Sequence, residues 1–190
     1  MKPIILGFTG KKGHGKTTAC LKAVEVLESK GYKIVRINFK DALISTMKHK
    51  LSRTLQLISD HYSLSIEELF EQKPPLMRTL MQEFGTEIYR SFDPDYWIMQ
   101  WYISIHGVSK DNKELMAIIT DDVRFSNEEL MLKAKMGILI RINRSNYNDD
   151  VSTTHQSEIE MDSFKPDHVI IASNREELEL NIEKLINQII

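Results

Sequence analysis

Before its first helical pattern the chain reads Gly10-Lys11-Lys12-Gly13-His14-Gly15-Lys16-Thr17, which matches the phosphate-binding pattern G-x-x-x-x-G-K-[ST] at every fixed position. The apolar run 4–8 in front of it is typical of a buried strand, and the residues behind it repeat like a helix with one apolar face. The motif requires a glycine loop between a strand and a helix, because successive backbone N–H groups can then face phosphate oxygens. The sequence therefore predicts that the chain binds a nucleoside triphosphate.

The loop also supplies the side chains that a bound nucleotide needs. Lys16 is expected to neutralise the β and γ phosphates, and the Thr17 hydroxyl is expected to bind Mg²⁺. The residues predicted to hold the nucleotide in this loop are Gly10, Lys12, Gly13, His14, Gly15, Lys16, Thr17 and Thr18.

The composition is that of one domain of ordinary size. The 190 residues carry a formal net charge of −2, which gives no support for a nucleic acid or a membrane surface held by bulk charge. The single cysteine, Cys20, excludes an intramolecular disulfide and is expected to be a small core residue. No signal peptide is recognised, and no run approaches the ~18 apolar residues of a membrane span, so a cytoplasmic location is expected.

Apolar runs and helical patterns alternate along the chain. Strands are expected at 4–9, 33–39, 115–120, 138–142 and 169–172. Helices are expected at about 16–30, over Leu43 to Ile58, from Ser63 or Ser65 through Phe70, from Pro75, from Asp93-Pro94, at about 126–136 and at 175–189. A polar turn is expected at 107–113 and a mobile polar segment at 143–163. This alternation predicts a three-layer α/β fold of the P-loop NTPase type, with a mostly parallel sheet flanked by helices.

Charged residues collect where the expected strands end, which is where ligands bind in parallel sheets. Asp121 and Asp122 follow the run 115–120, and one of them is expected to hold the hydration shell of Mg²⁺. Asp122 is the predicted metal residue, although the choice between the two aspartates stays open, and capping of the next helix is the alternative role.

Phosphoryl transfer concentrates negative charge on the transferred group, so arginines near strand ends are candidates for catalysis. The candidates are Arg78, Arg90, Arg124, Arg141 and Arg144. Lys16, Arg124 and Arg144 are the predicted catalytic residues, because Arg124 lies two residues after Asp122 and Arg144 opens the polar segment. That segment contains His155, Ser157 and Glu158, whose spacing fits neither a metal site nor a catalytic triad, and a substrate-dependent lid is expected there.

Further motifs follow the loop in order. They are Phe39-Lys40-Asp41-Ala42-Leu43, Arg78 to Glu87 with the pattern R-x-L-[LM]-Q-x-x-G-T-[ED], Tyr96-Trp97, Asp122-Val123-Arg124 with Asn127-Glu128, and Arg144 followed by His155-Gln156-Ser157-Glu158. In this order they resemble the phage-type deoxynucleoside monophosphate kinases, within the nucleoside monophosphate kinase group. The resemblance covers nearly the whole chain. It departs at Ser145, where the family usually has proline.

The resemblance implies transfer of the ATP γ-phosphate to a deoxynucleoside monophosphate, with ATP and Mg²⁺ as cofactors and deoxynucleotide supply as the role. It implies one P-loop kinase domain over 1–190, with a monophosphate-binding insert at about 40–107 and a lid at about 143–163. The implied substrate-binding residues are Lys40, Arg78, Gln82, Gly85, Thr86, Glu87, Arg90, Trp97 and Asp122. Trp97 has two equally weighted roles, stacking on a base or packing in the core. Asn174 is the residue expected near the adenine.

Other functions stay open at this stage. One alternative is a kinase of another small acceptor, such as dephospho-coenzyme A, and a second is a P-loop ATPase or nucleotide switch. A GTPase motif N-K-x-D is not matched by Asn112-Lys113-Glu114-Leu115. The expected partner is a small-molecule deoxynucleotide, without nucleic acid or membrane. Base selectivity and the oligomeric state, with a homodimer as one alternative, stay open, and a phage source, with action in the host cytoplasm, is implied only by the resemblance.

Overall fold

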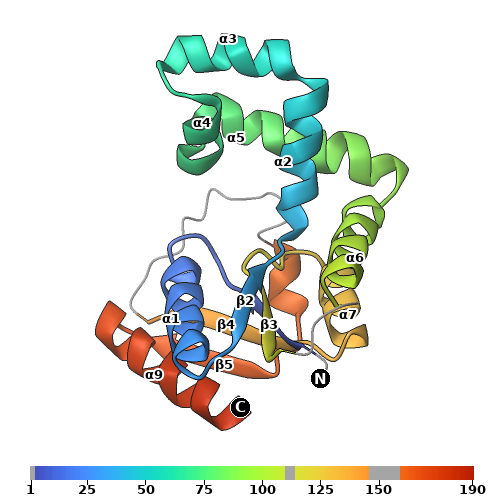
Figure 1. Cartoon of the computed structure of the whole chain (residues 1–190). Helices are drawn as coiled ribbons and strands as arrows, with labels where there is room; N and C mark the ends of the chain where they lie inside the picture. Colours follow the sequence, from blue (N-terminus) through green and yellow to red (C-terminus); the bar gives the residue numbers. More distant parts are fainter. Residues whose placement is uncertain (1–2, 110–113, 146–158) are drawn as a thin grey trace. The chain divides into compact units, whose positions relative to one another are not determined.

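A computed structural model describes residues 3–109, 114–145 and 159–190 of the chain (Figure 1). The chain divides into two compact units, of which the first comprises Met1–Asn38 with Tyr102–Ile190 and the second comprises Phe39–Trp101. The second unit covers most of the insert that the sequence predicts at about 40–107.

The first unit is built on a sheet of five parallel strands in the order β2-β3-β1-β4-β5. The strands are β1 (Ile4–Thr9), β2 (Lys33–Arg36), β3 (Met116–Thr120), β4 (Ile138–Arg144) and β5 (His168–Ala172). The predicted parallel α/β architecture is therefore confirmed, and all five expected strands form. The second strand ends three residues early, because Phe39 already begins a helix and Ile37 and Asn38 lie between them.

Helices cover both faces of this sheet. On one face α1 (Lys16–Ser29) and α9 (Arg175–Ile189) lie side by side over the strands (Figure 1). Their apolar residues form one core with the strand residues Leu6, Phe8, Ile140 and Ile142. On the other face α7 (Ser126–Ala134) packs so closely on β1 that a Cβ at Gly7 would lie 2.3 Å from a methyl carbon of Leu132.

The second unit is helical. Its elements are α2 (Phe39–Lys50), α3 (Ser52–Tyr62), α4 (Ile66–Gln72), α5 (Pro75–Gln82), the π-helix η1 (Glu83–Arg90) and the first part of α6 (Tyr96–Ser109). Its own core contains Met47, Leu55, Ile58, Leu69, Phe70, Met77 and Phe84. These residues recur at helical spacing, so each helix turns one apolar side inward.

Other local details also differ from the sequence prediction, and α6 begins at Tyr96, two residues after the predicted start at Asp93-Pro94. The helix expected over Leu43 to Ile58 is interrupted at Leu51, whose backbone leaves the helical region. The prediction of a polar turn at 107–113 is wrong for residues 107–109, because α6 continues to Ser109. Residues 110–113 lie outside the described residues. In the polar segment, β4 extends to Arg144 and a short 3₁₀ helix, η2, forms at Glu160–Ser163. Residues 146–158 of the expected lid, with His155, Ser157 and Glu158, lie outside the described residues.

Ser65, rather than Ser63, caps α4. Its hydroxyl accepts a hydrogen bond from the Glu68 N–H, while the Glu68 carboxylate accepts one from the Ser65 N–H at 2.8 Å. The Ser65 hydroxyl also donates to the Glu68 carboxylate, at 2.7 Å. The two hydrogen bonds that Ser65 donates to this carboxylate, first of all the backbone one, hold the pKa of the Glu68 carboxyl below its ordinary value. The sequence left both serines open because each lies within reach of the helix start.

Candidate active site

The phosphate-binding loop lies at the carboxyl end of β1, where its glycines adopt backbone angles that other residues avoid. Gly10 has φ 142° and Gly15 has φ 93°. A Cβ at Gly10 would lie 2.4 Å from the carbonyl oxygen of Ile142, so even alanine would clash with the neighbouring strand. The loop can therefore keep this path only with glycine at these positions.

Lys16 lies at the start of α1 and folds back over the loop. Its ammonium group donates to the carbonyl oxygens of Gly10 and Lys11, the latter at 2.8 Å. Gly15 is the N-cap of α1 and has no side chain that could cap the first turn. The positive end of the helix dipole and the ammonium group thus occur together, which is the arrangement that binds phosphate.

The other predicted nucleotide-binding residues differ in their exposure. Lys12, Gly13 and Thr17 are exposed, Thr18 is half-buried, and His14 is only 8% exposed. The Nδ1 atom of His14 accepts a hydrogen bond from the backbone N–H of Arg144 at 3.2 Å. The loop is therefore joined to the end of β4 as well as to β1.

The two aspartates follow β3, which pairs directly with β1. Asp122 is 8% exposed and Asp121 is half-buried. The Asp121 N–H donates to the side-chain oxygen of Asn38 at 2.8 Å, so the ends of β2 and β3 are held together at this point. Both carboxylates lie at the same sheet edge as the loop, and oxygen donors of this type suit Mg²⁺.

Arg124 is held by a buried carboxylate that sequence reasoning did not assign a role. Glu128 is 2% exposed, and its carboxylate accepts hydrogen bonds from the N–H groups of Arg124 and Phe125 at 2.8 and 3.1 Å. These bonds cap α7 and fix the turn that carries Arg124. A glutamate three residues after a helix cap is a signal that the sequence does contain.

Arg141 and Arg144 have different surroundings at the end of β4. Arg141 is half-buried, and its guanidinium group donates to the carbonyl oxygen of Met161 in η2. This contact favours a structural role for Arg141. Arg144, the last residue of β4, is exposed to solvent.

The helix η2 joins three parts of the first unit. Asp162 forms an ion pair with Lys11 of the loop at 3.7 Å, and Glu160 accepts a hydrogen bond from the Ser126 N–H at 2.8 Å. Arg141 supplies the third contact, to the Met161 carbonyl. Sequence reasoning missed Glu160 and Asp162, because no motif marks them.

Asn174 is the N-cap of α9. Its side-chain oxygen accepts a hydrogen bond from the Glu177 N–H at 2.9 Å. The N–H and hydroxyl of Ser173 donate to the Glu177 carboxylate, and these bonds, led by the backbone one, hold the pKa of Glu177 below its ordinary value. Asn174 therefore has a capping role in addition to the adenine contact that the sequence predicts.

Substitution of Asn174 separates these two roles. Asn174→Ala is expected to destabilise the protein by about 1 kcal/mol, because the cap is lost. Asn174→Asp retains a capping oxygen and is expected to keep the stability, while it removes the amide donor. Thermal unfolding reports the cap, and the KM for ATP reports the adenine contact. An unchanged KM in Asn174→Asp would contradict a role of the amide donor at the adenine.

In the second unit, the motif Arg78 to Glu87 spans α5 and the π-helix η1. Arg78 and Gln82 lie one helical turn apart on α5, with Arg78 exposed and Gln82 half-buried. Thr86, Glu87 and Arg90 lie in η1, where Arg90 donates to the Pro94 carbonyl at 3.2 Å. Such π-helical turns are rare and frequently occur at functional sites.

Lys40 lies in the first turn of α2 and is half-buried. It shares the second unit with the motif residues Arg78 and Gln82. The unit therefore carries positive and polar side chains from α2 and α5, the two helices whose motifs the sequence connects with the acceptor.

Trp97 is buried in the second unit and is only 3% exposed. Its indole N–H donates to the Gly85 carbonyl at 2.9 Å, and its ring lies 4.8 Å from that of Tyr89 and 4.7 Å from that of Tyr96, measured between centroids. A Cβ at Gly85 would lie 3.0 Å from a methyl carbon of Leu43. These contacts favour the core role of Trp97, and they give Gly85 a packing role where the sequence suggests an approach of the substrate.

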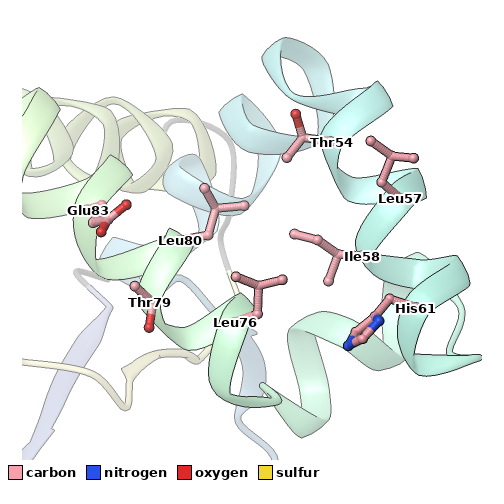
Figure 2. Close-up of a pocket in the computed structure, with 8 residues that line it drawn as sticks. All are labelled: Thr54, Leu57, Ile58, His61, Leu76, Thr79, Leu80 and Glu83. Atoms are coloured by element: carbon pink, nitrogen blue, oxygen red, sulfur yellow. The ribbon is translucent and has the colours of Figure 1, made fainter.

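A hollow of about 250 Å³ opens between α3 and α5 within the second unit (Figure 2). Leu57, Ile58, Leu76 and Leu80 supply its apolar lining. Thr79 and Glu83, which belong to the motif Arg78 to Glu87, also line the hollow. The motif therefore has one helix side with Arg78 and Gln82 and another side that faces the hollow.

None of the helices in the described ranges combines the length and apolarity that a membrane crossing requires. Within those same ranges, no group of three or more His, Cys, Asp or Glu side chains could hold a metal ion.

The chain is similar to a family model, to a viral protein and to a solved structure. A family model described as "Deoxynucleotide monophosphate kinase" matches residues 50–185, a stretch that begins after the phosphate-binding loop. A protein of Acanthamoeba polyphaga mimivirus named "Putative deoxynucleotide monophosphate kinase" is 28% identical over 199 residues, which cover 98% of this chain and 94% of that protein. A solved structure of an APS kinase from Mycobacterium tuberculosis aligns over 99% of this chain and 97% of its own, with 8% identity and a TM-score of 0.48.

Proposed function

The chain belongs to the deoxynucleotide monophosphate kinase family, and we propose that it transfers the γ-phosphate of ATP to a deoxynucleoside 5′-monophosphate. The products are ADP and a deoxynucleoside 5′-diphosphate. The observation that carries this proposal is the phosphate-binding loop, whose glycines have positive φ and whose Lys16 lies at the N-terminus of α1. The loop lies outside the stretch that matches the family model, so the two lines of support are separate.

The reaction needs no covalent enzyme intermediate, because a phosphate oxygen of the acceptor is already a nucleophile. A bond forms between this oxygen and the γ phosphorus, and the bond from the γ phosphorus to its bridging oxygen breaks as ADP leaves. The protein contributes positioning and charge neutralisation. We assign the neutralisation to Lys16, Arg124 and Arg144. Lys16 lies on the loop, Arg124 follows β3, Arg144 is the last residue of β4, and both strands are adjacent to β1.

The residues also fit Mg²⁺, which when bound supplies a Lewis acid that compensates charge on the phosphate oxygens. Thr17 offers a hydroxyl in the first turn of α1, and Asp122 offers a carboxylate at the end of β3. Mg²⁺ is commonly held by one or two protein oxygens, with waters and substrate phosphates completing its shell. Asp121 is the alternative carboxylate.

We assign recognition of the acceptor to the second unit. Lys40 and Arg78 are suited to its phosphate, because both are cationic and neither is buried. The remaining proposed contacts within this unit are Gln82, Thr86, Glu87 and Arg90. We place Trp97 behind them, where its hydrogen bond to Gly85 supports the π-helix.

The proposed reaction supplies deoxynucleoside diphosphates, and we place it in the cytoplasm, where ATP and deoxynucleotides are available. The mimivirus relative is consistent with a viral origin of the chain. A deoxynucleotide is a small-molecule partner, and the proposal includes neither a nucleic acid nor a membrane.

The test is ADP release with ATP and Mg²⁺ against a panel of deoxynucleoside and ribonucleoside monophosphates, with dephospho-coenzyme A included. We expect strong turnover with at least one deoxynucleoside monophosphate and none after chelation of Mg²⁺. ADP release that is independent of every acceptor would instead show an ATPase or switch. Turnover with dephospho-coenzyme A alone would also overturn the proposal.

A further inference from the structure

His14 is a polar residue with little access to solvent in the middle of the phosphate-binding loop. His14 is 8% exposed. Its backbone N–H donates a hydrogen bond to the Lys11 carbonyl at 3.3 Å, which holds the His14 backbone in the turn of the loop. A buried imidazole is costly unless its nitrogens find partners. The partner of Nδ1 is the backbone N–H of Arg144, at 3.2 Å.

The direction of this bond determines the tautomer of His14. A backbone N–H can only donate, so Nδ1 must be an unprotonated acceptor, and the proton of the neutral ring lies on Nε2. The bond therefore depends on one particular ring atom. A side chain that offers an acceptor at the position of Nδ1 can replace it, whereas one that offers an acceptor only at the position of Nε2 cannot.

The imidazole occupies the place where a strand would otherwise pair with β4. The Ile142 carbonyl points toward Gly10, because a Cβ built on Gly10 would lie 2.4 Å from the Ile142 oxygen. Arg144 is two residues further on and therefore turns its N–H to the same side. The strand β1 ends at Thr9, before it could pair there, and the chain enters the loop. The Nδ1 atom of His14 therefore accepts the hydrogen bond from β4 that a backbone carbonyl of a paired strand would otherwise accept.

The side chain of Arg144 starts on the sheet face that α1 covers. Ile140 and Ile142 belong to the core formed with α1 and α9, and alternation along β4 puts Arg144 on that same face. The phosphate-binding loop leads into α1. A bond between the loop and the backbone of Arg144 therefore connects two of the groups that the proposed function assigns to the transferred phosphate, the loop with its Lys16 and Arg144.

We propose that His14 is a positioning residue that holds Arg144 at a constant distance from the phosphate-binding loop. This inference rests on the proposed function, because it concerns the same phosphoryl transfer. His14 acts through the backbone of Arg144, and a displacement of about 1 Å at a catalytic group can lower a rate about 100-fold.

Three substitutions of His14 in the full chain test this role. His14→Asn offers an oxygen near the place of Nδ1, and kcat is expected to stay within about threefold of wild type. His14→Gln places its oxygen near Nε2, and His14→Leu has no acceptor, so both are expected to lower kcat about tenfold or more with little change in the KM for ATP. Equal losses in all three variants would overturn the proposal.

A double-mutant cycle with Arg144→Ala distinguishes positioning from a general effect on the loop. If His14 acts through Arg144, His14→Leu costs less than about twofold in the Arg144→Ala background. The same loss in both backgrounds would show an independent role of His14 and would overturn the proposal. Thermal unfolding verifies that each variant is folded.

Amide hydrogen exchange of Arg144 provides a readout that needs no activity. Protection of its N–H is expected in wild type and His14→Asn, and to fall in His14→Leu and His14→Gln. Equal protection in all four proteins would overturn the proposal. If the wild-type enzyme phosphorylates no deoxynucleotide, the proposed function fails by itself, and this exchange measurement still decides whether the contact exists.

Discussion

Replacing Lys16 by alanine is expected to abolish phosphoryl transfer, with a loss of at least about 100- to 1,000-fold in kcat, while the protein stays folded. The Lys16 ammonium group lies over the loop, bonded to the carbonyl oxygens of Gly10 and Lys11. Without it, the negative charge of the phosphates has no such partner at the N-terminus of α1. ADP formation with ATP, Mg²⁺ and the best acceptor measures the effect.

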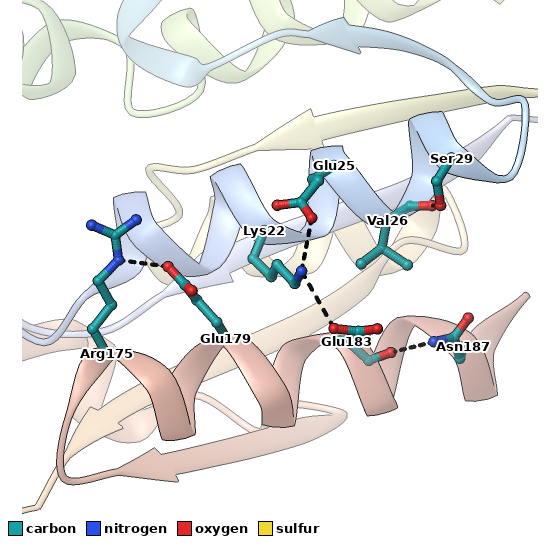
Figure 3. A network of polar contacts seen from close by, with 8 residues as sticks. All are labelled: Lys22, Glu25, Val26, Ser29, Arg175, Glu179, Glu183 and Asn187. Carbon is teal, nitrogen blue, oxygen red and sulfur yellow. Dashed lines mark hydrogen bonds and ion pairs between the residues drawn. The ribbon is translucent and has the colours of Figure 1, made fainter.

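Lys22→Ala is the matched control for this experiment. Lys22 lies on the same helix and interacts with Glu25 at 2.8 Å and Glu183 at 3.3 Å, on the side where α1 and α9 meet (Figure 3). Its removal takes away one lysine of α1 but no group of the proposed site, so activity is expected to stay unchanged. A folded Lys16→Ala enzyme with near-normal activity would disprove the assignment of the loop.

Replacing Trp97 by alanine is expected to destabilise the protein by about 3–5 kcal/mol, as for other large buried aromatic side chains. The substitution empties the space between Tyr89 and Tyr96 and removes the donor to the Gly85 carbonyl. Trp97→Phe keeps most of the ring but loses the donor, so a smaller loss of about 1–3 kcal/mol is expected. Chemical denaturation followed by circular dichroism measures both.

Met99→Ala on the same helix is the control, because Met99 is 46% exposed and its truncation is expected to change stability by less than about 0.5 kcal/mol. The alternative role of Trp97, stacking on a base, leads to a different result. Unchanged stability in Trp97→Ala together with a raised KM for the acceptor would support stacking. It would contradict the core role that burial and the hydrogen bond to Gly85 favour.

The position of Asp121 and Asp122 follows from the local sequence pattern, but their environments do not. Their position directly after an apolar strand predicts that they lie at the edge of the sheet, and the structure places them there. Their environments differ, since Asp121 is tied to Asn38 and Asp122 is nearly buried. The contact of Asp121 depends on Asn38, which follows β2 and is distant in sequence. The residue spacing within 115–122 therefore could not predict that the two aspartates have different environments.

Glu128 occupies a capping position that the sequence contains, although its structural role is not evident from the sequence. The pair Asn127-Glu128 is part of a sequence motif, but the role of Glu128 depends on the N–H groups of Arg124 and Phe125, which both turn toward its carboxylate. A capping glutamate is local, and its spacing could have predicted the cap. That the capped turn carries Arg124 follows from the chain order, whereas the burial of the carboxylate depends on the packing around α7.

The strand, loop and helix around Gly10 to Thr17 follow from the amino-acid sequence alone, because glycine backbone freedom and apolar periodicity act between near neighbours. The same holds for the parallel α/β architecture, which follows from alternating strands and helices. The contact of His14 with Arg144, which are 130 residues apart, is different. It exists because β4 lies beside β1 and extends beyond its end, and neighbouring strands bring together residues whose separation in sequence carries no information about their distance.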